Sequence, residues 1–109
     1  MSGRDESLAQ NESDHRQVNE QIEQRVLLFA GEEPSFGIVC ECDRRECDRR
    51  LVVNVADYEQ IREDPLLFIV VPGHEDEQVE DVVEGDRREY LIVRKRGDAA
   101  DEAERSDPR

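Results

Sequence analysis

The chain has 109 residues, of which 40% are charged and 36% are hydrophobic. Its 29 acidic residues outnumber its 15 basic residues, which gives a formal net charge of −14 at pH 7. An electrostatic field of this sign repels nucleic acid and anionic membrane surfaces, so neither is an expected partner. The small apolar content allows one small domain, whose core would need additional stabilisation.

The two ends of the chain differ in composition from its middle. Residues 1–12 are polar and irregular, which predicts a disordered N-terminus. Residues 98–109 are charged and lack large apolar side chains, which predicts a flexible acidic tail, so residues 13–97 are left as a single domain. The start of the chain has no apolar targeting segment, and the apolar run "LLFIVV" at 66–71 is too short to span a bilayer. We therefore expect a cytoplasmic protein with reduced thiols.

Two helices are predicted. The first, over residues 13–30, carries one stripe of apolar residues at helical spacing: Val18, Ile22, Val26 and Phe29. Such a stripe could bind a partner, but more often it covers a sheet. The second helix is short, because it follows a potential N-cap at Asn54 and ends before Pro65.

Strands are predicted in five segments. These are "FGIVCEC" at 36–42, "LVVNV" at 51–55, "LLFIVV" at 66–71, and a hairpin in which "VEDVVE" and "EYLIVRKR" flank the turn "GDRR" at 85–88. The predicted fold class is therefore α+β, with a small, mostly antiparallel sheet, an N-terminal helix and a short second helix. A metal site is predicted to staple this domain together.

All the cysteines of the chain lie close together in the spacing Cys-x-Cys-x4-Cys, at Cys40, Cys42 and Cys47. Side chains at i and i+2 of a strand share a face, so Cys40 and Cys42 should point together while Glu41 turns away. The following loop can return Cys47 to the same point. Three thiolates in this arrangement predict a site for one zinc ion, which usually takes a fourth ligand.

Either of the two histidines could supply the fourth ligand. We prefer His74, because it follows a buried strand and a Pro-Gly turn that can fix its direction. His15 lies off the apolar stripe of the first helix and is the alternative. If neither histidine serves, Glu75, Asp76 or a water molecule could complete the shell. The predicted metal ligands are therefore Cys40, Cys42, Cys47 and His74.

The loop between the cysteines repeats the block Cys-Asp-Arg-Arg, which contributes Arg44, Arg45, Arg49 and Arg50. These arginines could donate hydrogen bonds to the sulfur atoms or offset the negative charge of a zinc-thiolate centre. They could equally belong to a solvated loop. Without a metal, the same positive charges would lower the thiol pKa values and favour reactivity. A metal-free thiol switch and inert buried cysteines therefore remain as alternative interpretations.

The sequence contains no Gly-x-Ser-x-Gly nucleophile motif and no glycine-rich phosphate loop, so no catalytic residues are predicted. We expect a small non-enzymatic zinc-binding domain that acts as a regulatory or accessory factor by binding another protein. The first alternative is a thiol/zinc redox sensor in which the cysteines exchange zinc for a disulfide. A weaker alternative is a zinc-dependent hydrolase in which Glu75 acts as the general base beside His74. The sequence predicts no oligomeric state.

Several motifs occur together along the chain: "CEC" at 40–42, Cys47, "DYEQIREDP" at 57–65, "FIVVPGHE" at 68–75, "YLIVRK" at 90–95 and a terminal "DPR". As a set, over about residues 14–97, they resemble a family of small uncharacterised proteins from actinobacteria. In that family a Cys-x-Cys-x4-Cys cluster precedes a Tyr-Glu helix, and a Pro-Gly-His-Glu turn follows a strand. The resemblance implies that Cys40, Cys42 and Cys47 pair with His74, and it implies no established activity.

Overall fold

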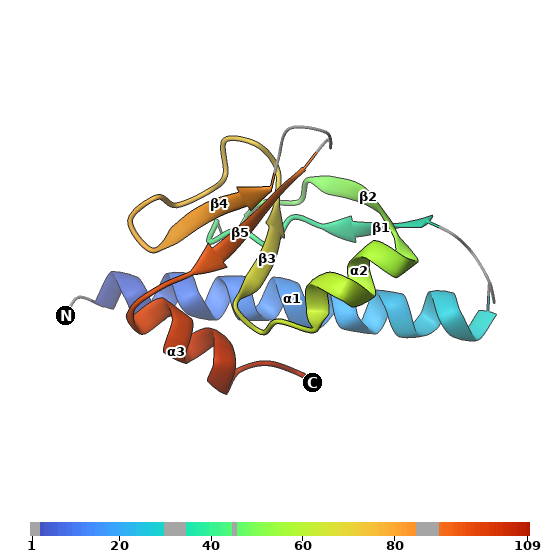
Figure 1. Ribbon diagram of the computed structural model, residues 1–109, viewed down its shortest axis with the longest axis horizontal. Helices are drawn as coiled ribbons and strands as arrows, with labels where there is room; N and C mark the ends of the chain where they lie inside the picture. Colours follow the sequence, from blue (N-terminus) through green and yellow to red (C-terminus); the bar gives the residue numbers. More distant parts are fainter. Residues whose placement is uncertain (1–2, 30–34, 45, 85–89) are drawn as a thin grey trace.

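The computed structural model describes residues 3–29, 35–44, 46–84 and 90–109, with the backbone alone for residues 3–10 and 29. In chain order the elements are α1 (Gly3–Phe29), β1 (Ser35–Val39), β2 (Arg50–Asn54), α2 (Val55–Arg62), β3 (Leu67–Val70), β4 (Glu80–Glu84), β5 (Leu91–Lys95) and α3 (Asp98–Arg105). The strands form two antiparallel sheets, one in the order β1-β2 and one in the order β3-β5-β4 (Figure 1). The predicted α+β class, with its N-terminal helix and short second helix, is confirmed.

The strand registers place apolar residues opposite one another. The central pairs are Phe36 with Val53, Phe68 with Val93 and Val82 with Val93. The turn that was predicted at residues 85–88, between β4 and β5, lies outside the described residues. The buried core draws on both sheets and on α2, and its apolar members include Phe36, Ile38, Tyr58, Phe68, Ile69, Ile92 and Val93.

The two sheets meet where β1 ends. The backbone N–H of Cys40 still donates to the carbonyl of Arg49 at 2.9 Å, within the first hairpin. The next N–H, that of Glu41, donates to the carbonyl of Ile69 in β3 at 2.8 Å. The chain therefore passes from one sheet to the other between Cys40 and Glu41, and this crossing is the place where the cysteines lie.

Helix α1 spans the whole molecule. Its 27 residues contain no proline and no glycine after Gly3, so the helix continues for about 40 Å along one side of both sheets (Figure 1). It begins at Gly3 rather than at Ser13, so α1 includes most of the segment that was predicted to be disordered. A tertiary contact explains the difference, because buried Glu12 pairs with Lys95. None of the described helices is both long enough and apolar enough to cross a membrane.

The face of α1 that packs on the domain is polar, which corrects the predicted apolar stripe. Val18 is 43% exposed, while Ile22 and Val26 are half-buried against the core, and the side chain of Phe29 lies outside the described residues. Among the side chains described for residues 11–28, the buried ones are instead Glu12, Arg16, Asn19, Glu20 and Glu23. Spacing alone cannot identify such a face, because its burial depends on partners in distant segments.

The segment predicted as a flexible tail contains α3, which packs on α1 and β5. Arg16 of α1, which is fully buried, donates to the carbonyl of Ala103 at 2.7 Å and to that of Pro65 at 2.6 Å. The helix lacks large apolar residues, but Asp98 in its first turn and Arg105 in its last turn fit the helix dipole. In the sequence, these two charges were the feature that could have indicated a helix in this segment.

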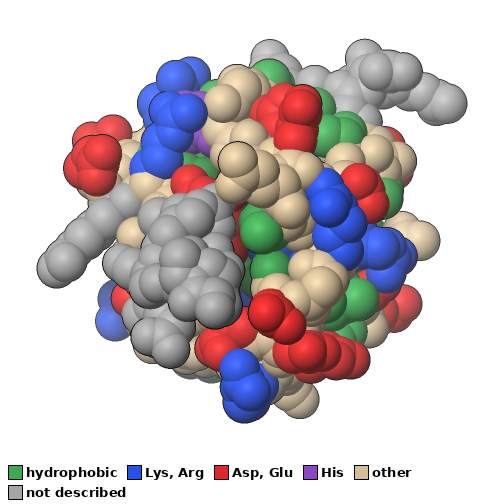
Figure 2. Space-filling view, turned by 90° about the vertical axis from the view of Figure 1, so that its left-hand side faces the viewer, with side chains coloured by type: hydrophobic (Ala, Val, Ile, Leu, Met, Phe, Trp, Pro, Cys, Tyr) green, Lys and Arg blue, Asp and Glu red, His purple; other side chains and the backbone are tan. Residues whose placement is uncertain are grey.

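The outer surface of the protein carries mixed charge. In a view onto one end of the molecule, acidic and basic side chains are interspersed, and hydrophobic side chains show only in small separate groups (Figure 2). The net charge of −14 is therefore not gathered into a single patch on this face.

Two buried carboxylates share one lysine at the contact between α1 and the second sheet. The ammonium group of Lys95 donates to both Glu12 and Glu80, and these side chains are 1%, 7% and 1% exposed, respectively. Burial raises the pKa of Glu12 to about 7, and the charge of Lys95 only partly opposes this shift. Burial also raises the pKa of Glu80. The cluster therefore takes up a proton more readily than an exposed carboxyl would.

The raised pKa of Glu12 predicts that stability falls as pH rises from about 4.5 to about 7. In this range the unfolded chain has already lost the proton that the folded chain still holds, so the native state binds more protons. The shift from 4.5 to about 7 corresponds to about 3 kcal/mol at most. Urea unfolding at pH 5 and pH 8 is expected to show a smaller loss of stability for Glu12→Gln than for the wild type. Equal losses in the two proteins would contradict the prediction.

Candidate metal centre

Cys40 and Cys42 follow β1 directly and point to the same side, as predicted. Their sulfur atoms belong to one compact group of potential metal ligands. Glu41, between them, points the other way and is fully buried. Its carboxylate accepts hydrogen bonds from Arg62 at 2.5 Å and from the backbone N–H of Ile69 at 3.0 Å. The residue between the two cysteines therefore anchors the chain while the thiols face the site.

The repeated Cys-Asp-Arg-Arg block produces the same local contact twice. The backbone N–H of Arg44 interacts with the sulfur of Cys42, and the backbone N–H of Arg49 interacts with the sulfur of Cys47. A turn in which the N–H of Cys47 donates to the carbonyl of Arg44 at 3.1 Å brings the third cysteine back toward the first two. The repeat therefore supplies one backbone N–H two residues after each of these cysteines, where it stabilises a thiolate.

His74 is placed by a tight turn at the end of β3. The backbone N–H of His74 donates to the carbonyl of Val71 at 2.9 Å, and Gly73 has φ = 96°. Proline at the second position and a positive-φ glycine at the third are typical of a type II turn. Since β3 pairs with the chain at Glu41, this turn lies directly beside the cysteines.

The structure brings together the predicted ligands Cys40, Cys42, Cys47 and His74, which we call the Cys3His centre. Their ligand atoms all lie within 4.8 Å of one another. The Nδ1 atom of His74 is 3.6 Å from the sulfur of Cys40 and 3.5 Å from that of Cys47. These four residues could hold one metal ion.

The alternative fourth ligands have other partners. His15 does reach the same chain segment, but its Nδ1 lies 2.9 Å from the carbonyl oxygen of Cys42 and not beside the sulfur atoms. The carboxylate of Glu75 accepts a hydrogen bond from the backbone N–H of Gly73 at 2.7 Å. Asp76 accepts one from the N–H of Gln78 at 3.1 Å. His74 is therefore the histidine that joins the cysteines.

The electrostatics of the centre differ from those expected for an arginine-activated thiol. The hydrogen bond between the Cys42 thiol and Cys40, followed by burial, raises the pKa of Cys42, and burial raises the pKa of Cys47. The expectation that the arginines lower the thiol pKa is therefore wrong for these two residues. Burial and then the positive charges of Arg44 and Arg49 lower the pKa of His74, which favours the neutral imidazole that binds metal.

The groups around the sulfur atoms come mainly from the backbone. The N–H of Val71 donates to the sulfur of Cys40 at 3.2 Å. The side chain of Arg44 donates to the carbonyl of Gly73 at 3.4 Å, so it joins the cysteine loop to the histidine turn. Arg45 lies outside the described residues, and Arg50 is an exposed residue at the start of β2. The arginines were predicted to support the sulfur atoms, and the side chain of Arg44 instead joins the two loops that carry the ligands.

Helix α1 holds the cysteine segment through side chains that recur every four residues, a feature that the sequence reasoning missed. These are Asn11, His15 and Asn19, which bond to the backbone of Asp43, Cys42 and Val39, respectively. Asn19 makes three of the contacts: it donates to the carbonyl of Val39 at 2.8 Å and to Glu41 at 2.7 Å, and it accepts from the N–H of Val39 at 2.7 Å. In the sequence, these contacts could have been indicated by the spacing of four residues between side chains that can both donate and accept hydrogen bonds.

Replacing Asn19 by alanine is expected to destabilise the fold by about 3 kcal/mol, because it leaves polar groups of Val39 and Glu41 buried without their partner. It should also weaken metal binding about tenfold, since the cysteine segment loses an anchor. Urea unfolding and competition with a metal chelator measure the two effects. Gln17→Ala, an exposed position of the same helix, is the control and should change neither quantity.

Comparison with known protein families finds no family model that matches the chain. No curated protein matches its sequence, and no solved structure matches its fold. The resemblance to small actinobacterial proteins therefore stays an expectation. The chain contains a Cys3His group, at the crossing between its two sheets, that could hold a metal ion.

Proposed function

We propose that the Cys3His centre binds one zinc ion, and that the protein is a non-enzymatic regulatory or accessory factor that binds another protein. The distances from the His74 Nδ1 atom to two sulfur atoms, 3.6 and 3.5 Å, carry the zinc proposal. Tetrahedral zinc with bonds of about 2.3 Å to sulfur and about 2.0 Å to nitrogen would separate these atoms by about 3.5 Å. Three thiolates with one imidazole are also a common ligand set for structural zinc.

The ligand count favours a structural role over a catalytic one. Four protein ligands fill a tetrahedral shell, whereas a catalytic zinc site keeps one position for water or substrate. The hydrolase alternative also needs Glu75 as a general base, but its carboxylate caps the backbone N–H of Gly73. A structural zinc site therefore fits these residues better than a hydrolase does.

A zinc ion at this place would tie together the two sheets and the loop between the cysteines. Cys40 and Cys42 lie after β1, Cys47 lies in the loop before β2, and His74 lies after β3. The zinc ion would therefore hold together segments that a small apolar core stabilises only weakly. Binding of zinc by the folded state alone would add its binding free energy to folding.

The surface supports binding to another protein. Leu27 and Leu28, near the end of α1, are 45% and 76% exposed. Gln21, Gln24, Arg25 and Leu28 line a shallow recess on the same half of the helix. Exposed leucines beside polar groups on a long helix are the kind of surface that a partner protein can cover.

A redox sensor is the second candidate, because the thiol groups lie close enough to react with one another. Peroxide would oxidise two zinc-bound thiolates to one disulfide. The peroxide would take up two electrons and two protons and become water, and the zinc ion would be released. The raised pKa values of Cys42 and Cys47 argue against this role for the metal-free protein, since thiols that stay protonated are poor nucleophiles.

Native mass spectrometry before and after mild peroxide tests both candidates. One zinc ion per chain, retained in peroxide, is the expected result for the structural role. Loss of zinc together with a mass decrease of two hydrogens would favour the sensor. A protein that folds without any bound metal would contradict both. Affinity capture with the zinc-loaded protein, compared with the same protein carrying Leu28→Glu, tests whether a partner uses the exposed end of α1.

A further inference from the structure

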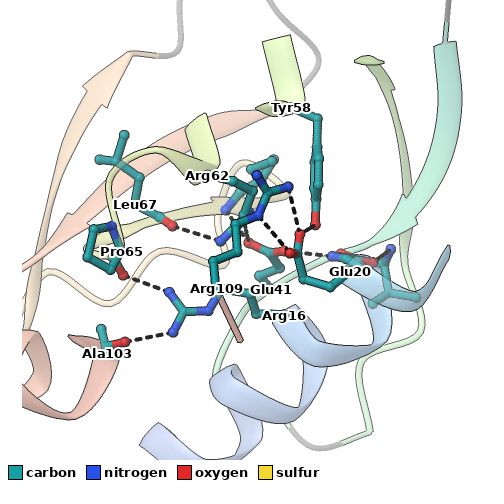
Figure 3. A network of polar contacts seen from close by, with 12 residues as sticks. Arg16, Glu20, Glu41, Tyr58, Arg62, Pro65, Leu67, Ala103 and Arg109 are labelled. Atoms are coloured by element: carbon teal, nitrogen blue, oxygen red, sulfur yellow. Dashed lines mark hydrogen bonds and ion pairs between the residues drawn. The ribbon is translucent and has the colours of Figure 1, made fainter. Parts of the chain in front are cut away.

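A second cluster of charged groups lies away from the metal centre, where the end of the chain folds back onto α1 and α2. The guanidinium group of Arg109 sits among three carboxylates, which we call the acidic cradle: Glu20, Glu23 and Glu59 (Figure 3 shows Arg109 beside Glu20). The nearest contacts are 2.8 Å to Glu20, 3.2 Å to Glu23 and 2.7 Å to Glu59. Nε and both terminal nitrogens of the guanidinium donate to the cradle.

The cradle is preformed rather than a chance meeting of surface charges. The side chains of Glu20 and Glu23 are only 7% and 4% exposed. The hydroxyl group of Tyr58, which is fully buried, donates to Glu20 at 2.6 Å and fixes its orientation (Figure 3). Buried carboxylates are costly unless they are paired, so a cradle of this kind needs a cation.

Glu23 shows that the single arginine does not saturate the cradle. Its Oε1 accepts from Arg109, but its buried Oε2 has no donor among the described residues while the group is ionised. Burial, together with the neighbouring Glu59, raises the pKa of Glu23 to about 8, whereas Arg109 holds the pKa of Glu59 at about 2. Near neutral pH a protonated Glu23 can therefore donate to Glu59, which leaves the two charged carboxylates of Glu20 and Glu59 facing the single charge of Arg109.

Arg109 is held in a way that would let another arginine side chain take its place in the cradle. Arg109 is 32% exposed and Glu59 is 45% exposed, so the cradle opens to solvent on the α2 side. The guanidinium group makes the hydrogen bonds that connect residues 107–109 to α1 and α2. The backbone N–H of Arg109 donates only to Asp107 of the same segment, at 3.2 Å. Among the described residues, the side chain of Arg109 thus links this segment to α1 and α2, while the N–H of Asp107 donates to the carbonyl of Glu104 in α3 at 3.4 Å.

We propose that the acidic cradle is a recognition site for an arginine side chain of a partner protein, and that Arg109 occupies it as an internal competitor. The planar guanidinium with its five donors matches carboxylates held at fixed angles, whereas a lysine offers one point charge. The overall charge of −14 favours the approach of a basic segment. This inference names the chemistry of the partner, and so it rests on the protein-binding part of the proposed function and not on zinc.

Fluorescence anisotropy with a labelled Gly-Ser-Arg-Ser-Gly peptide tests the proposal. Arg109→Ala should bind this peptide at least about tenfold more tightly than the wild type, because the internal competitor reduces the fraction of open sites. The corresponding lysine peptide should bind Arg109→Ala at least about fivefold more weakly than the arginine peptide. Arg105→Ala is the control, because this exposed arginine pairs with Glu102 inside α3, and it should bind like the wild type.

A second substitution in the Arg109→Ala protein checks the site itself. Adding Glu59→Gln should weaken peptide binding at least about fivefold, whereas adding Glu63→Gln, an exposed acid just after α2, should not. Equal peptide affinity for Arg109→Ala and the wild type would overturn the proposal. Binding of free L-arginine at least as tight as that of the peptide would overturn the assignment to a partner protein.

Two further measurements separate the failure of this inference from other failures. If Arg109→Ala does not fold, Arg109→Lys replaces it, because lysine keeps the charge but loses the fork of donors, and the same tighter binding is expected. Zinc content is measured in the same samples. Normal zinc with no peptide binding would reject the cradle alone, whereas missing zinc with tight peptide binding would reject the zinc proposal and leave the cradle.

Discussion

Replacing Cys47 by serine is expected to abolish metal binding and to unfold most of the protein at 37 °C. A serine hydroxyl is a poor replacement for a thiolate, and structural zinc contributes about 10–16 kcal/mol to folding when its site is complete. That contribution is as large as the whole stability of a typical domain, about 5–15 kcal/mol. The bound metal per chain should fall from about one to below about 0.1, as measured by mass spectrometry. Circular dichroism should show a melting temperature lower by more than about 10 °C.

The chain provides matched controls for this result. Asp48→Ser changes the neighbouring residue of the same loop and should leave the metal content unchanged. His74→Ala should lose the metal, whereas His15→Ala should keep it with affinity lowered about tenfold, because His15 lies at 2.9 Å from the Cys42 carbonyl and only supports the site. Retention of a full metal ion by both Cys47→Ser and His74→Ala would refute the Cys3His assignment.

Replacing Arg62 by methionine is expected to cost about 3–5 kcal/mol, because it leaves the buried carboxylate of Glu41 without its cation. The two side chains are 1% and 0% exposed and lie 2.5 Å apart. Asn19 and the N–H of Ile69 would still donate to Glu41, but neither carries a charge. Because Glu41 lies between two metal ligands, the same change should weaken metal binding at least about tenfold. Urea unfolding and chelator competition measure the two effects.

A surface ion pair serves as the comparison. Arg94 lies 2.7 Å from Asp64, but these side chains are 45% and 31% exposed, so Arg94→Met should cost less than about 1 kcal/mol. Adding Glu41→Gln to Arg62→Met should recover a large part of the lost stability, since it removes the unpaired charge and keeps a hydrogen-bond acceptor. No recovery in the double variant would show that Arg62 acts through packing against Tyr58 instead of through charge.

Several features of this protein could be read from the sequence because their causes are local. Asn54 caps α2 by accepting hydrogen bonds from the N–H groups of Ala56 and Asp57, at 2.8 and 3.4 Å, and any chain with this spacing can form the same cap. The alternation of side chains along a strand predicted that Cys40 and Cys42 point together. The Pro-Gly turn predicted a fixed direction for His74, and the structure places that residue beside the cysteines.

Other features depend on segments that are far apart in the chain. The stripe of Val18, Ile22 and Val26 predicted how α1 would pack, but the helix buries its polar face instead. Arg16 can be buried because it donates to carbonyls in α3 and in the turn before β3, which no local pattern of α1 contains. The region 98–109 lacked the apolar residues that indicate packing, yet Ala103 and Arg109 both contact distant elements.

The sequence by itself determined the cysteine cluster, the order of most elements and the turn that carries His74, because hydrogen bonds and backbone preferences within a few residues decide them. Only the tertiary structure decided that Asn19 anchors the cysteine segment, that Glu41 pairs with Arg62, and that Arg109 enters the acidic cradle. Each of these contacts stabilises polar groups that would be costly to bury alone. The favourable state exists only once partners from distant parts of the chain have come together.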